Sequence, residues 1–248
     1  MDRYGLIGYP LGHSFSQKYF TEKFDRESID ARYDLFPLTK IEEVEQLIDN
    51  TPGLRGFNVT IPYKQQIIKY LDGMDEEAKA IGAVNVVAVR HAADGRAILT
   101  GHNSDTYGFT ESIRPLLKET DKKALVLGSG GASKAVTYSL KKLGVDTVVV
   151  SRHPTAGQMA YADIDAAVLK DYTVVVNASP VGMFPRADEC PDIPYNLLTD
   201  RHVCFDLVYN PEETLFLKRA AERGASVKNG LEMLHLQAEG AWKMWQQD

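Results

Sequence analysis

Short apolar runs alternate along the chain with longer segments whose apolar residues recur at helical spacing. This alternation is typical of an α/β protein with mostly parallel sheets. The runs fall into two groups, which predicts two sheets and therefore two open α/β domains. In the first hundred residues, strands are predicted at 4–9, 33–37, 56–60, 84–89 and 97–100. Farther on, strands are predicted at 124–127, 147–151, 173–177, 203–207 and 226–228.

Helical spacing between the strands predicts helices at 16–24, 40–50 and 134–143. The segment 101–118 has the same character and is expected to connect the two halves. A last helix is predicted at 231–245, where apolar side chains recur at steps of three and four. They form one stripe of Leu234, Ala238, Ala241, Trp242 and Trp245. Gln237 lies one step round from this stripe, where it either borders a packed face or serves a ligand.

A glycine-rich turn follows the predicted strand 124–127. It reads Gly128-Ser129-Gly130-Gly131-Ala132-Ser133 and runs into the predicted helix 134–143. A strand, a glycine turn and a helix in this order are the context of a dinucleotide fingerprint. Gly128 permits the tight turn, Gly130 lets a pyrophosphate approach the backbone, and the helix start supplies N–H donors. The turn is alternatively a plain connection, or a site for S-adenosylmethionine on a similar sheet.

The end of the next strand discriminates between these ligands. An Asp or Glu there usually holds a ribose hydroxyl, whereas a 2′-phosphate needs a cation. The strand ends in Ser151-Arg152-His153 and carries no carboxylate. Because an arginine offers a planar, permanently charged fork suited to phosphate, the sequence favours NADP over NAD and S-adenosylmethionine.

The predicted strand 56–60 delivers polar side chains to its carboxyl end, where ligands bind in open α/β sheets. Asn58 and Thr60 lie at that end, and Pro62 stops the strand so that Lys64 leaves the ladder. Lys64 is therefore either a functional cation beside two hydrogen-bonding side chains or an exposed surface lysine.

Composition excludes several classes of function. The chain has 248 residues, 44% hydrophobic and 25% charged, as expected for a globular protein of two domains. A net charge of −6 without a basic run argues against nucleic acid and anionic membranes. Cys190 and Cys204 lack the spacing of a disulfide framework or a metal site. The chain start lacks the apolar core of a signal peptide, which favours the cytoplasm.

Seven short segments resemble, in order and over nearly the full chain, the signatures of the shikimate dehydrogenase family. They are 8–16, 56–64, 81–85, 101–105, 177–183, 206–211, and 230–234 with 237–238. The resemblance implies an N-terminal substrate domain at 1–101, completed by the C-terminal helix 230–248. It places a Rossmann-type NADP-binding domain at 102–229 between them.

The resemblance implies reversible, NADPH-dependent reduction of 3-dehydroshikimate to shikimate, on the route to chorismate and the aromatic amino acids. It assigns catalysis to Lys64, as proton donor or electrostatic group, and to Asp105, which would hold the lysine. The implied substrate contacts are Ser14, Ser16, Asn58, Thr60, Asn85, Asp105, Tyr209 and Gln237. The implied cofactor contacts are Gly128, Ser129, Gly130, Gly131, Ala132, Ser133, Ser151, Arg152, Asn177, Ser179, Val181, Leu207, Gly230 and Met233.

Ser14 and Ser16 flank Phe15, so in an extended segment they would face the same way and donate to one substrate carboxylate. Alternatively, one of them caps the following helix. His13 is expected to be structural rather than catalytic.

Three positions depart from the family pattern. Gln17 replaces a common proline, Ser104 a common threonine, and Ser151-Arg152-His153 the usual Asn-Arg-Thr or Asn-Arg-Ser. The competing readings are a quinate/shikimate dehydrogenase, an S-adenosylmethionine-dependent transferase and a catalytically silent NADP-binding regulator. The expected partner is a small-molecule substrate, and no metal, nucleic acid or membrane is expected. The protein is expected to be a monomer or a homodimer.

Overall fold

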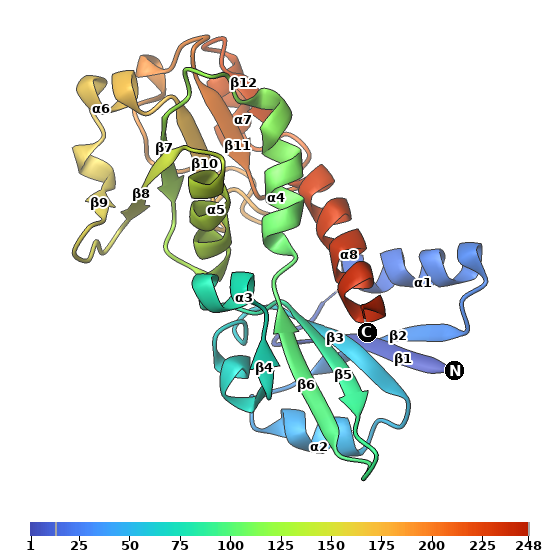
Figure 1. Ribbon diagram of the computed structural model, residues 1–248. Helices are drawn as coiled ribbons and strands as arrows, with labels where there is room; N and C mark the ends of the chain where they lie inside the picture. Colours follow the sequence, from blue (N-terminus) through green and yellow to red (C-terminus); the bar gives the residue numbers. More distant parts are fainter. Residues whose placement is uncertain (13, 248) are drawn as a thin grey trace. The chain divides into compact units, whose positions relative to one another are not determined.

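The computed structural model describes residues 1–12 and 14–247, so the expectation for His13 falls outside it. Contacts divide the chain into two compact units. The N-terminal unit is Met1–Ser104 with the stretch from Ala238 onward, and the central unit is Asp105–Gln237 (Figure 1). The family resemblance implies domain boundaries after residues 101 and 229, and these stay a prediction.

The N-terminal unit contains a six-stranded sheet in the order β2-β1-β3-β5-β6-β4. Its strands are β1 (Asp2–Gly8), β2 (Ala31–Pro37), β3 (Leu54–Val59), β4 (Gly73–Met74), β5 (Val86–His91) and β6 (Ala97–His102). The pairs β1–β2, β1–β3 and β4–β6 are parallel, whereas β5 runs antiparallel to both neighbours. A short turn closed by the Ala92 N–H on the Arg96 carbonyl makes β5 and β6 a hairpin, which imposes the antiparallel direction.

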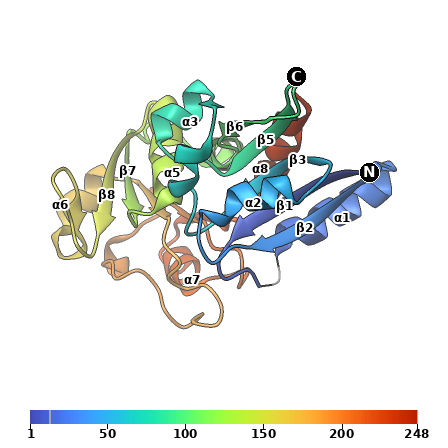
Figure 2. The same cartoon turned by 90° about the horizontal axis from the view of Figure 1, so that it is seen from below.

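Helices cover both faces of this sheet, which Figure 2 views from below. The helices of this unit are α1 (Phe15–Glu27), α2 (Glu43–Asp49), the 3₁₀ turn η1 (Gln66–Tyr70), α3 (Glu76–Ile81) and the last part of α8 (Leu231–Gln246). Val44, Ile67 and Ala78 of α2, η1 and α3 pack on one face. Phe20 of α1 and Trp245 of α8 pack on the other. Apolar side chains alternate along β1, so that Leu6 and Ile7 enter different cores.

The central unit contains a second six-stranded sheet in the order β12-β11-β10-β7-β8-β9, with every pair parallel. Its strands are β7 (Lys123–Leu127), β8 (Asp146–Ser151), β9 (Met159–Ala160), β10 (Val174–Asn177), β11 (Val203–Asp206) and β12 (Ser226–Lys228). Numbered from β7, this is the Rossmann order 3-2-1-4-5-6, in which ligands bind where the strand order reverses, between β7 and β10. The expectation of two open α/β domains, one of Rossmann type, is confirmed.

Helices flank both faces of the central sheet as well. They are α4 (Asp105–Ile113), η2 (Arg114–Leu116), α5 (Gly131–Lys142), η3 (Tyr161–Asp163), α6 (Ala166–Asp171), η4 (Tyr195–Leu197), α7 (Leu215–Ala221) and the first part of α8. Phe109, Val136 and Met233 bring α4, α5 and α8 into one core. Leu169 and Phe216 bring α6 and α7 into the other.

The largest error among the predicted elements is the helix expected at 101–118, of which only 105–113 is α-helical. Gly101 and His102 pair with Val87 and Val86 and complete β6, so α4 begins only at Asp105. It ends at Ile113, after which a 3₁₀ turn containing Pro115 follows, because proline cannot donate to a helical hydrogen bond. The two-residue strands β4 and β9 were also not predicted, since a pattern of alternation cannot be recognised over so short a run.

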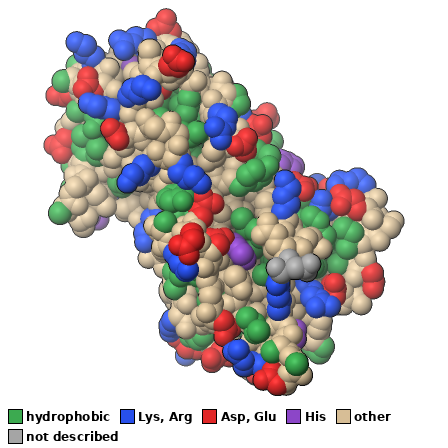
Figure 3. Space-filling model, in the orientation of Figure 1, with side chains coloured by type: hydrophobic (Ala, Val, Ile, Leu, Met, Phe, Trp, Pro, Cys, Tyr) green, Lys and Arg blue, Asp and Glu red, His purple; other side chains and the backbone are tan. Residues whose placement is uncertain are grey.

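None of the helices formed by the described residues is both long and apolar enough to cross a membrane. On the face shown in Figure 3, acidic and basic side chains are interspersed.

Candidate functional site

Asn58, near the end of β3, is buried and is hydrogen-bonded to β2 and to the residue just before β5. Its Oδ1 accepts the Tyr33 hydroxyl of β2 at 2.8 Å, and its Nδ2 donates to the Asn85 carbonyl at 3.3 Å. Burial raises the pKa of the Tyr33 phenol, which also hydrogen-bonds the Ser16 side chain. Tyr33 therefore links two predicted substrate residues, a role that no local pattern around residue 33 signals.

The serine pair does not lie in one extended segment, so that part of the prediction is wrong. Ser14 is extended, with φ −97° and ψ 126°, but it is the N-cap residue of α1, and Ser16 already lies in the first helical turn. Helical geometry replaces the strand alternation on which the prediction rested. Among the described residues, the Ser14 hydroxyl makes no capping hydrogen bond. Its side chain is thus not used by the helix.

The chain after β3 forms a tight turn that fixes Lys64. The Thr60 N–H donates to the Ile7 carbonyl at 3.0 Å, the Thr60 carbonyl accepts the Tyr63 N–H at 2.9 Å, and the Ile61–Pro62 peptide between them is cis. The Lys64 carbonyl then accepts the Val84 N–H at 2.7 Å, just before β5. The lysine side chain is half-buried, as expected of a residue taken out of the ladder at the strand end.

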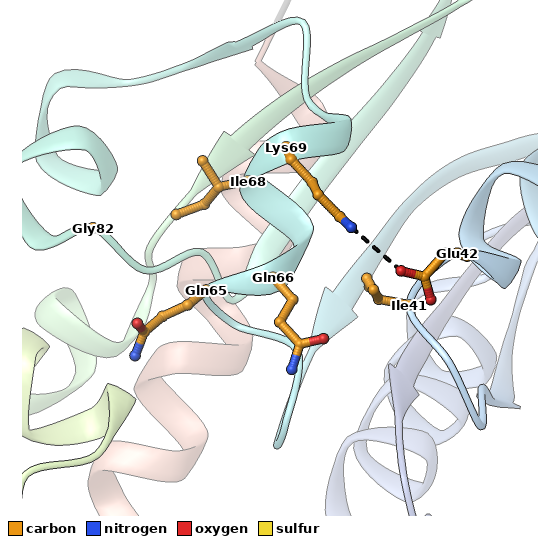
Figure 4. A pocket seen from close by; sticks show the side chains of 7 residues that line it. All are labelled: Ile41, Glu42, Gln65, Gln66, Ile68, Lys69 and Gly82. Carbon is orange, nitrogen blue, oxygen red and sulfur yellow. Dashed lines mark hydrogen bonds and ion pairs between the residues drawn. The ribbon is translucent and has the colours of Figure 1, made fainter.

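A pocket of about 470 Å³ lies beside this segment, on the N-terminal unit (Figure 4). It is lined by Ile41, Glu42, Gln65, Gln66, Ile68, Lys69 and Gly82. Glu42 and Lys69 form an ion pair across it at 3.3 Å. None of the predicted site residues lines this pocket, so the pocket is separate from the predicted site.

Asn85 and Ser104 fix the start of α4. The side chain of Asn85 both donates to and accepts from Ser104, and both residues are buried. The Asn103 side chain donates to the Ala83 carbonyl at 2.9 Å. Asp105 follows as the buried first residue of α4, where a carboxylate interacts favourably with the helix dipole. Lys64 and Asp105 belong to different units, and their predicted cooperation stays a prediction.

The glycine turn after β7 has the conformation that a dinucleotide site requires. Gly128 adopts φ +111°, and its N–H donates to the Val150 carbonyl at 2.8 Å. Gly130 is the N-cap of α5, and a Cβ at that position would meet no described atom within 4 Å. The helix start is therefore open to an approaching anion. The N–H groups of Gly131 and Ala132 precede the first helical hydrogen bond, which the Ser133 N–H donates to the Gly130 carbonyl at 3.2 Å.

Ser133 stands where the fingerprint usually has its third glycine. Its hydroxyl donates to the Gly130 carbonyl at 2.6 Å, and its side chain is only 2% exposed. The departure from the fingerprint is thus accommodated, because the hydroxyl fastens the turn from the buried side.

Arg152 is exposed directly after β8. Its guanidinium makes no hydrogen bond or ion pair with residues 1–12 or 14–247. Burial raises the pKa of the Tyr161 phenol, and the nearby Arg152 charge opposes that rise. The Ser151 hydroxyl accepts the His153 N–H at 3.2 Å and turns the chain. An open helix start and a cation at this strand end fit the pyrophosphate and the 2′-phosphate of NADP.

The remaining predicted residues also lie in the central unit. Asn177, at the end of β10, is fully buried and its side chain hydrogen-bonds Ser179 and Val181. Tyr209 is 38% exposed after β11. Leu207 and Met233 pack in the core of the unit, and a Cβ on Gly230 would collide with the Leu207 carbonyl. Gln237 donates to the Leu234 carbonyl at 3.1 Å within α8.

A parallel sheet in Rossmann order, with an open glycine turn at its switch point, defines a dinucleotide-binding α/β protein. Residues 6–87 match the family described as the shikimate dehydrogenase substrate binding domain. The shikimate dehydrogenase (NADP(+)) of Caldanaerobacter subterraneus is 35% identical over 260 residues, with 98% of this chain and 90% of the relative covered. This chain belongs to the shikimate dehydrogenase family.

Solved structures agree with this assignment. Shikimate dehydrogenase from Aquifex aeolicus is 33% identical with a TM-score of 0.85, covering 99% of this chain and 92% of that one. Shikimate 5-dehydrogenase from Thermus thermophilus, solved with NADP(H) and shikimate, is 30% identical with a TM-score of 0.85, covering 99% and 94%. The resemblance predicted from the sequence is confirmed.

Proposed function

We propose that this protein catalyses the reversible, NADPH-dependent reduction of 3-dehydroshikimate to shikimate, on the route to chorismate and the aromatic amino acids. One observation carries the proposal. A unit that matches the shikimate dehydrogenase substrate binding domain shares the chain with a dinucleotide-type glycine turn, and Arg152 follows the strand next to that turn. The open helix start at Gly130 supports a dinucleotide, and a guanidinium without a partner among the described residues supports a 2′-phosphate.

We assign cofactor binding to the central unit. The turn 128–133 receives the pyrophosphate on those of its backbone N–H groups that the sheet and the helix do not use, and Arg152 with Ser151 receives the 2′-phosphate. The segments ending β10 and β11 and the start of α8 complete the site with Asn177, Ser179, Val181, Leu207, Gly230 and Met233. When bound, NADPH supplies the hydride that reduces the substrate carbonyl carbon.

We assign substrate binding chiefly to side chains at the strand ends of the N-terminal unit. The Ser14 and Ser16 hydroxyls donate to the substrate carboxylate. For Ser14 this is supported by the lack of a capping hydrogen bond from its side chain to α1 among the described residues. Asn58, Thr60 and Asn85 hold ring hydroxyls, and Tyr209 and Gln237 of the central unit complete the contacts.

Lys64 is the assigned proton donor. The carbonyl oxygen gains negative charge as the carbon is reduced, and an ammonium group beside it both stabilises that charge and protonates it. Asp105 holds the ammonium group and accepts from a substrate hydroxyl. The backbone of Lys64, fixed by the Val84 N–H, restricts where this group can reach.

The proposal is tested by following the absorbance of the reduced nicotinamide, with shikimate or quinate as reductant and NADP or NAD as oxidant, in every pairing. We expect shikimate with NADP to be the fastest pair. Absence of turnover with shikimate would overturn the proposal, and faster turnover with quinate would replace it by a quinate/shikimate dehydrogenase. Binding of S-adenosylmethionine in calorimetry would indicate the transferase. The monomer or homodimer and the cytoplasmic location remain predictions.

A further inference from the structure

Asp206, the last residue of β11, is a carboxylate buried to 0% exposure in the central unit. Three donors satisfy it. Oδ1 accepts Asn177 Nδ2 at 2.9 Å and the Val208 N–H at 3.0 Å, and Oδ2 accepts the Thr214 hydroxyl at 2.6 Å. These donors come from three separate segments, so a single side chain connects all three.

The first connection is to the loop after β10. Asn177 Oδ1 accepts both the Ser179 N–H, at 3.1 Å, and the Ser179 hydroxyl, at 2.6 Å. Asn177 Nδ2 also donates to the Val181 carbonyl at 3.1 Å. The whole loop 177–181 is thus organised around one amide, and Asp206 fixes the orientation of that amide.

The second connection is to the segment after β11. Asp206 Oδ1 accepts the N–H of Val208, two residues farther along the chain, and this bond fixes the backbone just before Tyr209. The Val208 carbonyl accepts the Gly230 N–H at 3.2 Å, which places the start of α8 against the same turn. The third connection is to Thr214, the N-cap of α7, whose hydroxyl also accepts the Leu217 N–H at 3.3 Å.

Stability alone does not account for this carboxylate. Burial raises the pKa of Asp206 to about 6, which shows that the ionised form is unfavourable in this position. A buried ion can often be replaced by an apolar side chain of similar volume without loss of stability. The three connections, by contrast, need a side chain at this place that carries two hydrogen-bonding atoms, one of them an oxygen that accepts from Asn177 and Val208.

We propose that Asp206 is a positioning residue, which holds the loop 177–181 and the segment 207–209 in the arrangement that cofactor and substrate require. The inference rests on the proposed function, because it takes Asn177, Ser179 and Tyr209 as ligand contacts. Asp206 itself touches neither ligand and acts through the side chain of Asn177 and the backbone of Val208.

The test compares Asp206→Ala and Asp206→Leu with Asp206→Asn. In the asparagine variant, Oδ1 still accepts from Asn177 and Val208, and the amide donates to Thr214, whose hydroxyl can turn to accept. We expect Asp206→Asn to keep kcat/KM within about threefold of wild type, since a difference of this size is below 1 kcal/mol. Asp206→Ala and Asp206→Leu should lower kcat/KM about 10²-fold, as misplacement of binding groups by about 1 Å can do.

The matched control is Thr214→Val, which removes the Oδ2 partner and the α7 cap but leaves both connections to the binding segments. It should lower the melting temperature while keeping the KM for NADP. Titration calorimetry with NADP alone gives a second readout, in which the alanine and leucine variants should bind about tenfold or more weakly. A wild-type protein that binds NADP but does not oxidise shikimate would defeat the proposed function and leave this readout valid.

The leucine variant fills the volume of the aspartate and guards against a failure of the alanine variant to fold. Wild-type NADP affinity and kcat/KM in either folded variant would overturn the inference. An asparagine variant with kcat/KM and NADP affinity as low as those of the alanine variant would also overturn the inference, because the charge of Asp206 and not its hydrogen-bond geometry would then be needed for binding. Failure of both the alanine and leucine variants to fold would make Asp206 a requirement of folding and equally overturn the positioning role.

Discussion

Two hydrogen bonds join the side chain of Asn85 to Ser104. Asn85 Nδ2 donates to the Ser104 hydroxyl at 3.1 Å, and Asn85 Oδ1 accepts the Ser104 N–H at 2.8 Å. One side chain thereby fastens the end of β6 to the start of β5, directly ahead of Asp105. Asn85 is thus a structural residue whatever its contact with substrate.

Replacement of Asn85 should therefore destabilise the fold. Asn85→Ala leaves the buried Ser104 N–H without its acceptor, which should cost about 1–3 kcal/mol of unfolding free energy. Ser104→Ala keeps that bond and loses only the hydroxyl, at about 0.5–1.5 kcal/mol. Urea denaturation of both variants measures the difference, and equal losses would contradict the geometry described.

Ser14→Ala separates binding from helix capping. Replacing an N-cap serine whose side chain caps a helix costs about 1 kcal/mol. Because Ser14 makes no capping bond among the described residues, the melting temperature should stay unchanged. The KM for shikimate should rise by about 10-fold or more, as for the loss of a hydrogen bond to a charged acceptor. A lower melting temperature with unchanged KM would return Ser14 to the role of a cap.

Lys64→Ala tests the proton donor. The kcat should fall by about 10²- to 10⁴-fold while the KM changes less, because the lysine acts mainly on charge that develops in the transition state. Gln65→Ala is the matched control, since this exposed neighbour lines the separate pocket and should leave kcat unchanged. A folded Lys64→Ala protein with normal kcat would exclude the assignment.

Arg152 should determine the choice of cofactor. Its contact with the 2′-phosphate should contribute about 1.5–3 kcal/mol, which corresponds to about a 10- to 150-fold preference for NADP over NAD. Arg152→Ala should erode kcat/KM with NADP and leave NAD nearly as it was. Arg152→Asp should go further, because a carboxylate holds a ribose hydroxyl and repels phosphate. Equal losses with both cofactors in both variants would make the arginine structural.

The buried Asp206 carboxyl should make the free energy of unfolding decrease as the pH rises. Burial raises its pKa to about 6, above the ordinary 3.8, so the folded state holds the proton more tightly than the unfolded state does. The stability it contributes is then fully present below pH 3.8 and is lost as the pH rises through 6. The loss is on the order of 3 kcal/mol, at about 1.4 kcal/mol for each unit of pKa.

Other carboxylates titrate in the same range, so the measurement is a difference. The unfolding free energy of Asp206→Asn minus that of wild type should increase between pH 4 and pH 7. A difference that does not vary with pH would show that the Asp206 carboxyl keeps an ordinary pKa in the fold.

The sequence predicted the features that local pattern determines. Gly128 and Gly130 identified the dinucleotide turn because only their lack of a side chain allows the conformation and the approach. The position of Arg152 followed from the length of the preceding strand. The direction of β5 was missed although Asp94-Gly95 before β6 is a hairpin signal that the sequence carries.

Other features depend on contacts that no local pattern encodes. Tyr33 hydrogen-bonds Asn58, which lies 25 residues farther along the chain. Asp206 accepts hydrogen bonds from Asn177, which precedes β11 in the chain, and from Thr214, which follows it. The serine pair was misjudged because the helix begins at Phe15, one residue earlier than the apolar spacing indicated. Such partners become visible only when the strands are placed side by side.

Trp245 packs on the N-terminal unit but is synthesised after the central unit, and this order affects folding. Its indole N–H donates to the Val87 carbonyl at 3.0 Å, and its ring lies 4.8 Å from Tyr4 and 5.2 Å from Phe20, centre to centre. This side of the N-terminal unit is thus synthesised only after the whole central unit. At about 5–20 residues per second, the ribosome leaves that aromatic surface uncovered for roughly ten seconds or longer. The nascent N-terminal unit is therefore a natural client for chaperones that shield exposed apolar surface.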